Sequence, residues 1–211
     1  MIKVQNLFLQ IGDRVLVEDL SFRVAPGEVV AFMGSSGCGK TSVLKTLTQE
    51  RPLQKGHVSF EKDWAEIPQD ESLNPELSAL QNVNVGLLKD VSFWSGFKKI
   101  KSEQPRIMEL LKVWGLANPD QKVNSLSGGE KQRVCLVRAL VTEWKILFAD
   151  EPISQLDETN AHKVLSALRE EAKRRNGSIV WALHQPELAR KYSDRILVFD
   201  GRGHVQPEGQ R

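Results

Sequence analysis

The chain has 211 residues, 40% of them hydrophobic and 27% charged, which is the composition of a globular protein long enough to bury a core. Its net charge of +2 is too small for the basic surface of a nucleic-acid-binding protein, so no nucleic-acid partner is expected. The spacing of its two cysteines argues against a disulfide framework or a zinc site, and without an apolar run of about 18 residues we expect a cytoplasmic chain that does not itself cross a membrane.

The N-terminal part predicts a small antiparallel β layer, followed by a strand, a loop and a helix. Ranges 2–9 and 15–24 are rich in Val, Leu and Phe and flank the turn residues Gly12 and Asp13, which is typical of a β-hairpin. The apolar run 29–33 comes next, then a glycine-rich loop and a stretch with helical character. This order indicates an α/β core built on a parallel sheet.

The middle of the chain has a helical pattern, and we interpret residues 70–127 as a helical subdomain inserted into the core. Apolar residues recur there at helical spacing. Three residues are expected to break the helices: Gly86, Pro105 and Pro119. The core itself would then consist of 1–69 and 128–211, and the whole chain would be a single domain.

Core-like sequence returns after the helical stretch. Three apolar runs, at 146–149, 179–183 and 196–199, predict further strands, and a charged helical stretch separates the first two. Strands that alternate with helices predict parallel pairing. Residues 201–211 are expected to be frayed.

A glycine-rich motif lies between the strand at 29–33 and the helix that follows it. Residues 34–41 read Gly-Ser-Ser-Gly-Cys-Gly-Lys-Thr and fit the phosphate-binding pattern G-x-x-x-x-G-K-[ST] of a P-loop. The glycines let successive N–H groups point into one concavity, where they bind phosphate oxygens together with the helix N-terminus. Lys40 is expected to contact the β- and γ-phosphates of a nucleotide, and Thr41 to ligate Mg²⁺. The candidate nucleotide-binding residues of this loop are Gly34, Ser35, Ser36, Gly37, Cys38, Gly39, Lys40, Thr41 and Ser42.

An acidic pair, Asp150 and Glu151, follows the apolar run 146–149. In a parallel sheet the end of this strand would open beside the phosphate loop. Asp150 would hold Mg²⁺, and Glu151 would polarise the attacking water, because in-line phosphoryl transfer needs a positioned nucleophile. Alone, such a pair is more often a solvated loop or a helix cap. The phosphate loop favours the catalytic interpretation.

The segment Leu126-Ser127-Gly128-Gly129-Glu130 precedes another helical stretch. Ser127 and Glu130 form the spacing of a capping box, and the two glycines allow close backbone approach, so this helix N-terminus is a candidate second anion site. The simpler alternative is a well-capped helix without a ligand.

The same segment resembles the signature motif of ABC ATPases. The phosphate loop, the acidic pair and the helical insertion also occur in that family's order, so the resemblance covers nearly the whole chain. It implies Mg²⁺-dependent ATP hydrolysis by a dimer, which we expect to be a homodimer. In such a dimer Ser127, Gly128, Gly129 and Glu130 of one subunit face the γ-phosphate held by the other.

Three more positions match the family residue by residue. Gln69 resembles the Q-loop glutamine, which reaches Mg²⁺ and the attacking water, although a lone glutamine is usually a surface residue. Asp157 resembles the D-loop aspartate of the dimer interface and has the alternative role of an N-cap for the next helix. His184, which follows the run 179–183, resembles the switch histidine that contacts the γ-phosphate; a lone histidine is more often structural.

One position departs from the family pattern. Many members place an aromatic residue just before a glycine in the first hairpin, where it stacks on adenine, but that place is Ile11 here. Phe8 has the opposite strand parity and is expected to face elsewhere. Ile11 still offers an apolar surface, and we predict weak discrimination between ATP and GTP.

The length of the insertion resembles that of transporter subunits, which dock on separate membrane permeases. The resemblance therefore implies permease partners and a peripheral location on the inner face of the cell membrane. Residues 73–83, with Phe93 and Trp94, are similar to ATPases of phosphonate importers. A compact exporter or a lipoprotein-release ATPase is the alternative within transport, because no regulatory domain is expected after the last strand. A nucleotide-gated clamp is the alternative from another class.

An aromatic and basic cluster lies inside the insertion. Its members are Phe93, Trp94, Phe97, Lys98, Lys99 and Lys101. One interpretation is a docking or membrane-facing rim, since apolar patches with polar edges often mark partner sites. The other is aromatic packing inside the small lobe beneath a solvated run of lysines.

Overall fold

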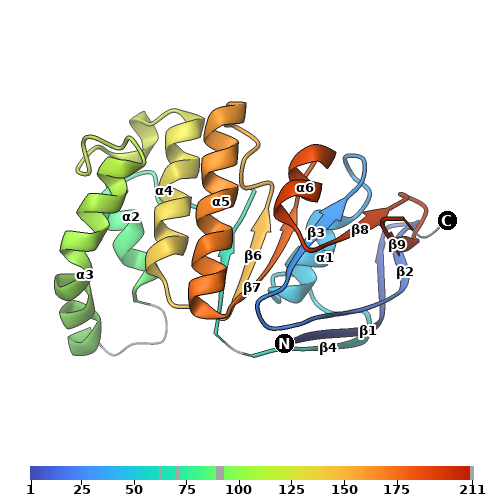
Figure 1. The fold of residues 1–211 in the computed structure, drawn as a ribbon. Helices are drawn as coiled ribbons and strands as arrows, with labels where there is room; N and C mark the ends of the chain where they lie inside the picture. The colour runs from blue at the N-terminus through green and yellow to red at the C-terminus, as the bar shows by residue number, and fades with distance from the viewer. Residues whose placement is uncertain (62, 70–71, 89–92, 210–211) are drawn as a thin grey trace.

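The computed structural model describes residues 1–61, 63–69, 72–88 and 93–209, apart from the side chains of Phe93 and Trp94. Within these residues the central sheet has the strand order β5-β6-β7-β3-β8-β9 (Figure 1). All neighbouring pairs are parallel except β8 and β9, which pair antiparallel. The strands are β3 (Val29–Met33), β5 (Trp64–Ile67), β6 (Ile146–Asp150), β7 (Ser178–Ala182), β8 (Arg195–Phe199) and β9 (Val205–Pro207).

A second sheet with the order β2-β1-β4 forms the predicted antiparallel layer. Its strands are β1 (Ile2–Ile11), β2 (Arg14–Val24) and β4 (Lys55–Ser59). The two-residue turn Gly12-Asp13 joins β1 to β2 and sets Ile11 opposite Arg14, so the predicted hairpin is confirmed. Its apolar residues pack against one face of the central sheet.

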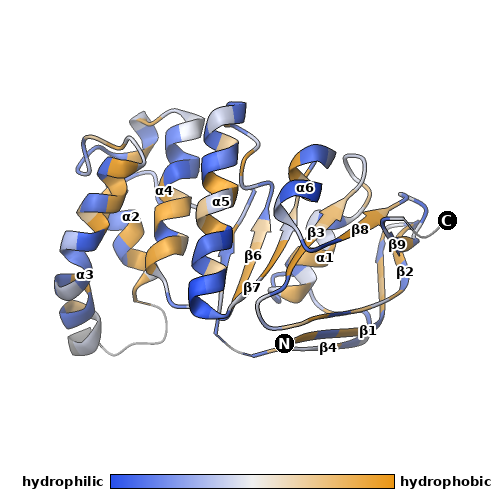
Figure 2. Cartoon of the chain, viewed as in Figure 1, coloured by the Kyte–Doolittle hydropathy of each residue, from blue (hydrophilic) through white to orange (hydrophobic). Residues whose placement is uncertain are grey.

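The alternating side chains of the central strands bury two separate clusters, one on each face of the sheet. Val30 and Phe32 of β3 pack with helix α1 (Lys40–Leu47) and the antiparallel layer. Ala31, between them, faces the other cluster, which contains α4 (Gly128–Val141), α5 (Glu158–Arg175) and α6 (Pro186–Tyr192). Figure 2 shows the central strands as mainly hydrophobic and α5 as largely hydrophilic. Helix α1 and the antiparallel layer cover one face of the sheet, and α4, α5 and α6 cover the other.

The helical lobe is built on α2 (Ala79–Gly86), α3 (Phe93–Val113) and the short 3₁₀ helix η1 (Val123–Ser125). Their apolar residues form a third cluster with Val134, Val137 and Val141 of α4. The opposite side of α4 packs on the sheet through Cys135 and Leu136. Helix α4 therefore contacts both the lobe and the core, and the boundaries 70–127 stay a prediction. The fold confirms the predicted α/β class with a parallel sheet, an antiparallel layer and a helical subdomain.

Pro105 does not break a helix as predicted, because α3 continues through it. A proline removes one backbone N–H and so leaves the carbonyl of Lys101 without its helical partner. Both residues are exposed, so water can bind that carbonyl. Ile107 and Leu111 are buried in the lobe cluster on the C-terminal side of the proline, and this packing keeps the helix continuous.

The C-terminal residues are not frayed throughout, contrary to our expectation. Asp200 accepts hydrogen bonds from the backbone N–H groups of Arg202 (2.7 Å) and His204 (3.1 Å) and so closes a turn. These bonds, led by that from Arg202, hold the pKa of the Asp200 carboxyl below its ordinary value. The turn returns the chain as β9 along β8. None of the described helices is both long enough and apolar enough to span a membrane.

Candidate nucleotide-binding and catalytic site

The phosphate loop connects β3 to α1, and its glycines are required by its shape. Gly34, Gly37 and Gly39 have φ angles of 145°, 73° and 113°, which residues with a Cβ rarely adopt. A Cβ at Gly34 would also lie 2.6 Å from the backbone oxygen of Phe199. Gly39 is the N-cap of α1 and has no side chain to satisfy the first N–H groups of the helix. This helix N-terminus is therefore available to an anion.

Lys40 folds back into the loop and is only 4% exposed. Its Nζ donates hydrogen bonds to the backbone oxygens of Gly34 (2.9 Å) and Ser35 (3.0 Å). The Cys38 thiol, 1% exposed, lies 3.7 Å from the same ammonium group. A buried cation held by neutral carbonyls can exchange them for phosphate oxygens, with which it forms stronger, charge-assisted bonds.

The acidic pair closes the end of β6. Asp150 is 6% exposed, and neither of its carboxylate oxygens has a hydrogen-bond partner. Burial raises the pKa of the Asp150 carboxyl above its ordinary value; the Thr41 hydroxyl beside it opposes this shift, and the neighbouring Glu151 carboxylate adds to it. Buried carboxylate oxygens without donors suit a hard divalent cation, so the donor set fits Mg²⁺.

Glu151 occupies an unusual backbone conformation, with a φ of 51°. For a residue with a Cβ this left-handed conformation costs about 1–2 kcal/mol. Such strain persists where the surroundings over-determine it, and it is concentrated at functional sites. The Glu151 carboxylate oxygen Oε1 contacts Nε2 of His184, which comes from the loop after β7.

Gln69, Glu151, His184 and the phosphate loop lie at the ends of four neighbouring strands. Gln69 follows β5, Glu151 follows β6, His184 follows β7 and the phosphate loop follows β3. Because parallel strands all end at the same edge of a sheet, residues far apart in the sequence meet there.

A cavity of about 420 Å³ opens beside the phosphate loop. Nine of the predicted residues line it: Ile11, Ser36, Gly37, Gly39, Lys40, Thr41, Ser42, Gln69 and Glu151. The remaining predicted members of the site do not line this cavity. Asp150 lines a small cavity together with Gln69, and Gly34, Ser35 and His184 line a separate hollow. Phe8 carries the Lys55 ammonium over its ring, 5.0 Å from the centroid, and does not line the cavity.

Two residues of the cavity wall, Arg14 and Leu16, escaped the sequence analysis. Both belong to β2, which presents them beside Ile11. The hairpin pattern alone contained a usable indication for Arg14, since a two-residue turn places it directly opposite Ile11.

The signature segment forms the predicted capping box at the start of α4 but lies outside the cavity. Ser127 N–H donates to Glu130 Oε2 (2.8 Å), and Glu130 N–H donates to Ser127 Oγ (3.4 Å). Hydrogen bonds from Ser127 hold the pKa of the Glu130 carboxyl below its ordinary value. A Cβ at Gly128 would lie 1.5 Å from Oε1 of Gln155, so a larger residue there would have to displace the end of that side chain.

Asp157 is the N-cap of α5, as predicted from its position. Its Oδ1 accepts a hydrogen bond from the backbone N–H of Asn160 (2.9 Å). This bond, together with one from the Asn160 side chain, lowers the pKa of the Asp157 carboxyl. The capping role does not exclude a role at a subunit interface, because the residue is exposed.

A glycine-rich cradle at a helix N-terminus, with an acidic pair at the end of a nearby parallel strand, defines the P-loop class of nucleoside triphosphatases. Within that class, the ABC transporter family model matches residues 17–154, and the chain belongs to this family. It is accordingly an ATP-binding subunit and an ATPase, as predicted.

Similar proteins include import subunits for phosphorus compounds. The chain is 34% identical to the phosphonates import ATP-binding protein PhnC 2 of Rhodopseudomonas palustris, an alignment that covers 95% of this chain and 84% of that protein. It is 30% identical to the PhnC protein of Fusobacterium nucleatum, with 93% and 87% covered. It is 31% identical to the hypophosphite import ATP-binding protein HtxD of Stutzerimonas stutzeri, with 95% and 66% covered.

Solved structures share the fold. An ATP-binding cassette determined as a dimer in a post-hydrolysis state, bound to ADP and phosphate, superposes with a TM-score of 0.81 at 24% identity over the full length of both chains. A second dimeric cassette of a bacterial ABC transporter gives a TM-score of 0.80 at 24% identity, again over both full chains.

Proposed function

We propose that this chain powers the import of a phosphonate-type phosphorus oxyanion, as a homodimer bound to separate permease subunits on the inner face of the cell membrane. We propose a dimer because the expected nucleotide contacts of one chain lie in two separate places. The phosphate loop and Glu151 line one cavity, whereas the signature glycines Gly128 and Gly129 lie outside it at the N-terminus of α4. A second copy can supply its own signature helix to that cavity.

Each side chain at the cavity has a distinct task in this proposal. Lys40 binds the β- and γ-phosphates, and the backbone N–H groups of residues 34–42 surround them. Thr41, Asp150 and Gln69 would hold Mg²⁺, which would supply positive charge against the phosphate oxygens. The unpartnered oxygens of Asp150 and the residues that line the cavity support these assignments.

Glu151 and His184 act on the reacting end of the nucleotide. Glu151 orients and polarises the attacking water, and His184 contacts the γ-phosphate. Their mutual contact holds the two side chains together at the neighbouring ends of β6 and β7. Asp157 and the signature residues Ser127 to Glu130 serve the partner subunit, since neither group lines the cavity of its own chain.

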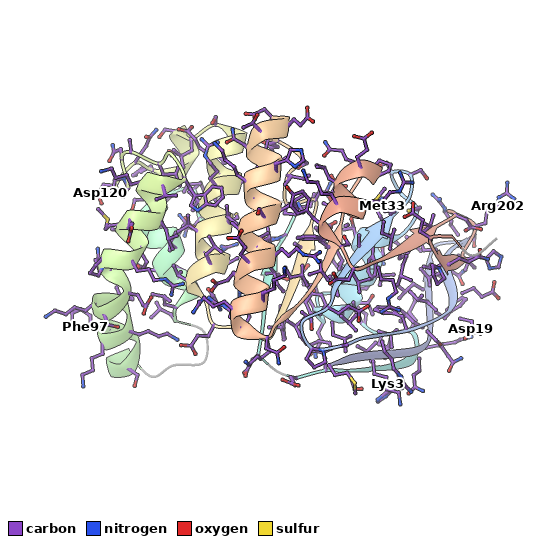
Figure 3. The ribbon with its side chains drawn as sticks, viewed as in Figure 1. Lys3, Asp19, Met33, Phe97, Asp120 and Arg202 are labelled. Carbon is purple, nitrogen blue, oxygen red and sulfur yellow. The ribbon has the colours of Figure 1, made fainter. Side chains whose placement is uncertain are left out.

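The likeness to import subunits favours import over the exporter and clamp alternatives. Phe97 supports a docking surface for the permease, because it is 64% exposed and points away from α3 into solvent (Figure 3). The packed alternative is therefore wrong for Phe97. The side chains of Phe93 and Trp94 lie outside the described residues.

Purification of the tagged chain from membranes of its source organism tests this function. A multi-spanning protein should co-purify, and the ATPase rate of the complex should rise when a phosphonate and its binding protein are added. Cells that carry only the Glu151→Gln form should fail to grow on that phosphonate as sole phosphorus source but grow normally on inorganic phosphate. Recovery of ribosomes or nucleic acid in place of a membrane protein would support the clamp instead.

A further inference from the structure

Gln132 lies in the second turn of α4 and is only 7% exposed. The hydrogen bonds of its side-chain amide all go to one short segment, the loop after β6. Nε2 donates to the backbone oxygen of Glu151 (3.3 Å) and to Oγ of Ser154 (2.9 Å), and Oε1 accepts from the N–H of Gln155 (3.2 Å). A buried amide whose donors and acceptor are all satisfied has a single favoured orientation.

The first of these bonds reaches the residue with the strained backbone. The left-handed conformation of Glu151 is fixed at its N–H by a bond to Ala182 (3.2 Å). Its carbonyl accepts from the N–H of Ser154 (3.2 Å), within the same turn, and from Gln132. Gln132 thus contributes a bond to Glu151 from another element of the fold, and the direction of the Glu151 side chain depends on that backbone conformation.

The segment 151–156 also contacts α4 nearer to the start of the helix. Oε1 of Gln155 covers Gly128, and the backbone oxygen of Gln155 lies 3.2 Å from the position of a Cβ on Gly129. Gln132 and the signature glycines are therefore two successive contacts along α4 with one loop. Since α4 also packs in the lobe cluster through Val134 and Val137, a shift of the lobe moves both contacts together.

We propose that Gln132 is a positioning residue that sets the backbone of Glu151 and makes its placement depend on the position of the signature helix. Hydrolysis is then fast only when α4 is seated against the loop, which couples the catalytic carboxylate to the lobe within one chain. The inference deepens the proposed function and rests on the role of Glu151 as the residue that polarises water.

Gln132→Met tests the proposal because methionine keeps the length of the side chain and removes its polar atoms. With the purified full chain in Mg-ATP, kcat should fall at least about tenfold, since small misplacements of a catalytic group have large effects on rate. Equilibrium binding of ATP should change by less than about twofold, because Gln132 does not line the cavity. Gln132→Asn, which withdraws the amide by one methylene, should give the same split if the methionine variant does not fold.

Two controls separate positioning from general damage to α4. Val137→Ala truncates a fully buried residue of the same helix and should lower thermal stability without a comparable loss of kcat. Ser154→Ala removes one partner of Gln132 and leaves the bond to Glu151, so its effect on kcat should be less than about threefold. A Gln132→Met kcat equal to that of Val137→Ala at matched stability would overturn the proposal.

The same assays, applied to Glu151→Gln, test the catalytic role of Glu151. In the Glu151→Gln background, Gln132→Met should change the residual rate by less than about twofold, because both substitutions act at one group. Normal hydrolysis by Glu151→Gln would reject the proposed catalytic role itself. Loss of hydrolysis in Glu151→Gln with a wild-type kcat in Gln132→Met would reject only the positioning role.

Discussion

His184 Nε2 contacts Glu151 Oε1 although the two residues are 33 positions apart in the chain. The contact exists because β6 and β7 are neighbours and end at the same level, with Asp150 paired to Ala182. It joins the two residues expected to act at the γ-phosphate. A change in one side chain will therefore alter the environment of the other.

Glu151→Gln should preserve ATP binding and lower kcat at least about 100-fold, since a neutral amide cannot polarise water but keeps nearly the same shape. The variant should also accumulate as a closed dimer in ATP, because the phosphate contacts remain. Steady-state ATPase assays, nucleotide binding and size-exclusion chromatography with ATP measure the three effects. Near-normal hydrolysis would contradict the catalytic role.

Lys40→Ala should show the opposite pattern and weaken nucleotide binding itself. Loss of the charge-assisted contacts to phosphate should raise the Kd for ATP about 10- to 100-fold. Equilibrium titration with a fluorescent ATP analogue provides the measurement, and Glu151→Gln is the comparison because it should bind normally. An unchanged Kd for Lys40→Ala would contradict the assignment of the phosphate loop.

The features predicted correctly are those set by residues close together in the sequence. The capping box at Ser127, the N-cap at Asp157 and the phosphate loop depend on residues within one or two turns of each other, so sequence position implies the local geometry of each. The hairpin turn belongs to the same group. The parallel pairing of the core strands also follows from the alternation of apolar runs with helices along the sequence.

The features that escaped prediction depend on contacts between distant segments. The edge strand β5 and the short β9 have weak patterns of their own and are strands because β6 and β8 provide partners. Gln132 is an ordinary polar residue of a helix until the loop after β6 folds against it. Pro105 likewise shows that packing of the lobe outweighs a local helix breaker.

The side chain of Ile11 leads us to expect little selectivity between adenine and guanine at the site. It is 47% exposed at the cavity wall and offers a small apolar surface, with Arg14 beside it, so ATP and GTP should bind with similar affinity. Ile11→Tyr should tighten ATP binding about tenfold, because aromatic stacking on a base contributes about 1–3 kcal/mol. Side-by-side titration of both nucleotides tests this, and a strong preference of the unmodified chain for ATP would contradict it.

We expect the permease to dock on the surface that contains Phe97. Phe97→Asp should reduce co-purification of the membrane protein severalfold and leave the ATPase rate of the isolated chain unchanged, because the residue is exposed and far in sequence from the cavity residues. Val113→Asp is a matched control, since Val113 is 70% exposed at the other end of α3. Equal losses for both variants would point to damage of the helix and not to a docking surface.

Glu171 predicts a pH dependence of stability. Burial opposes ionisation of its carboxyl, but hydrogen bonds from Arg174 and Arg175 outweigh burial and hold its pKa below the ordinary value of 4.5. Arg175 also donates to the backbone oxygen of Leu140 (2.7 Å) at the end of α4, so Glu171 supports the packing of α4 against α5. Glu171→Gln should lower the free energy of unfolding by about 1–3 kcal/mol at pH 7.

A lowered pKa in the folded state stabilises the fold at every pH above the pKa of the unfolded chain, and this contribution disappears as pH falls through the folded value. The difference in free energy of unfolding between the original chain and Glu171→Gln should therefore be constant from pH 6 to 8 and shrink below about pH 4.5. Urea unfolding over this range measures the difference, and Glu170→Gln, one residue away, serves as the control. A difference that grew on acidification would contradict the ionised pair.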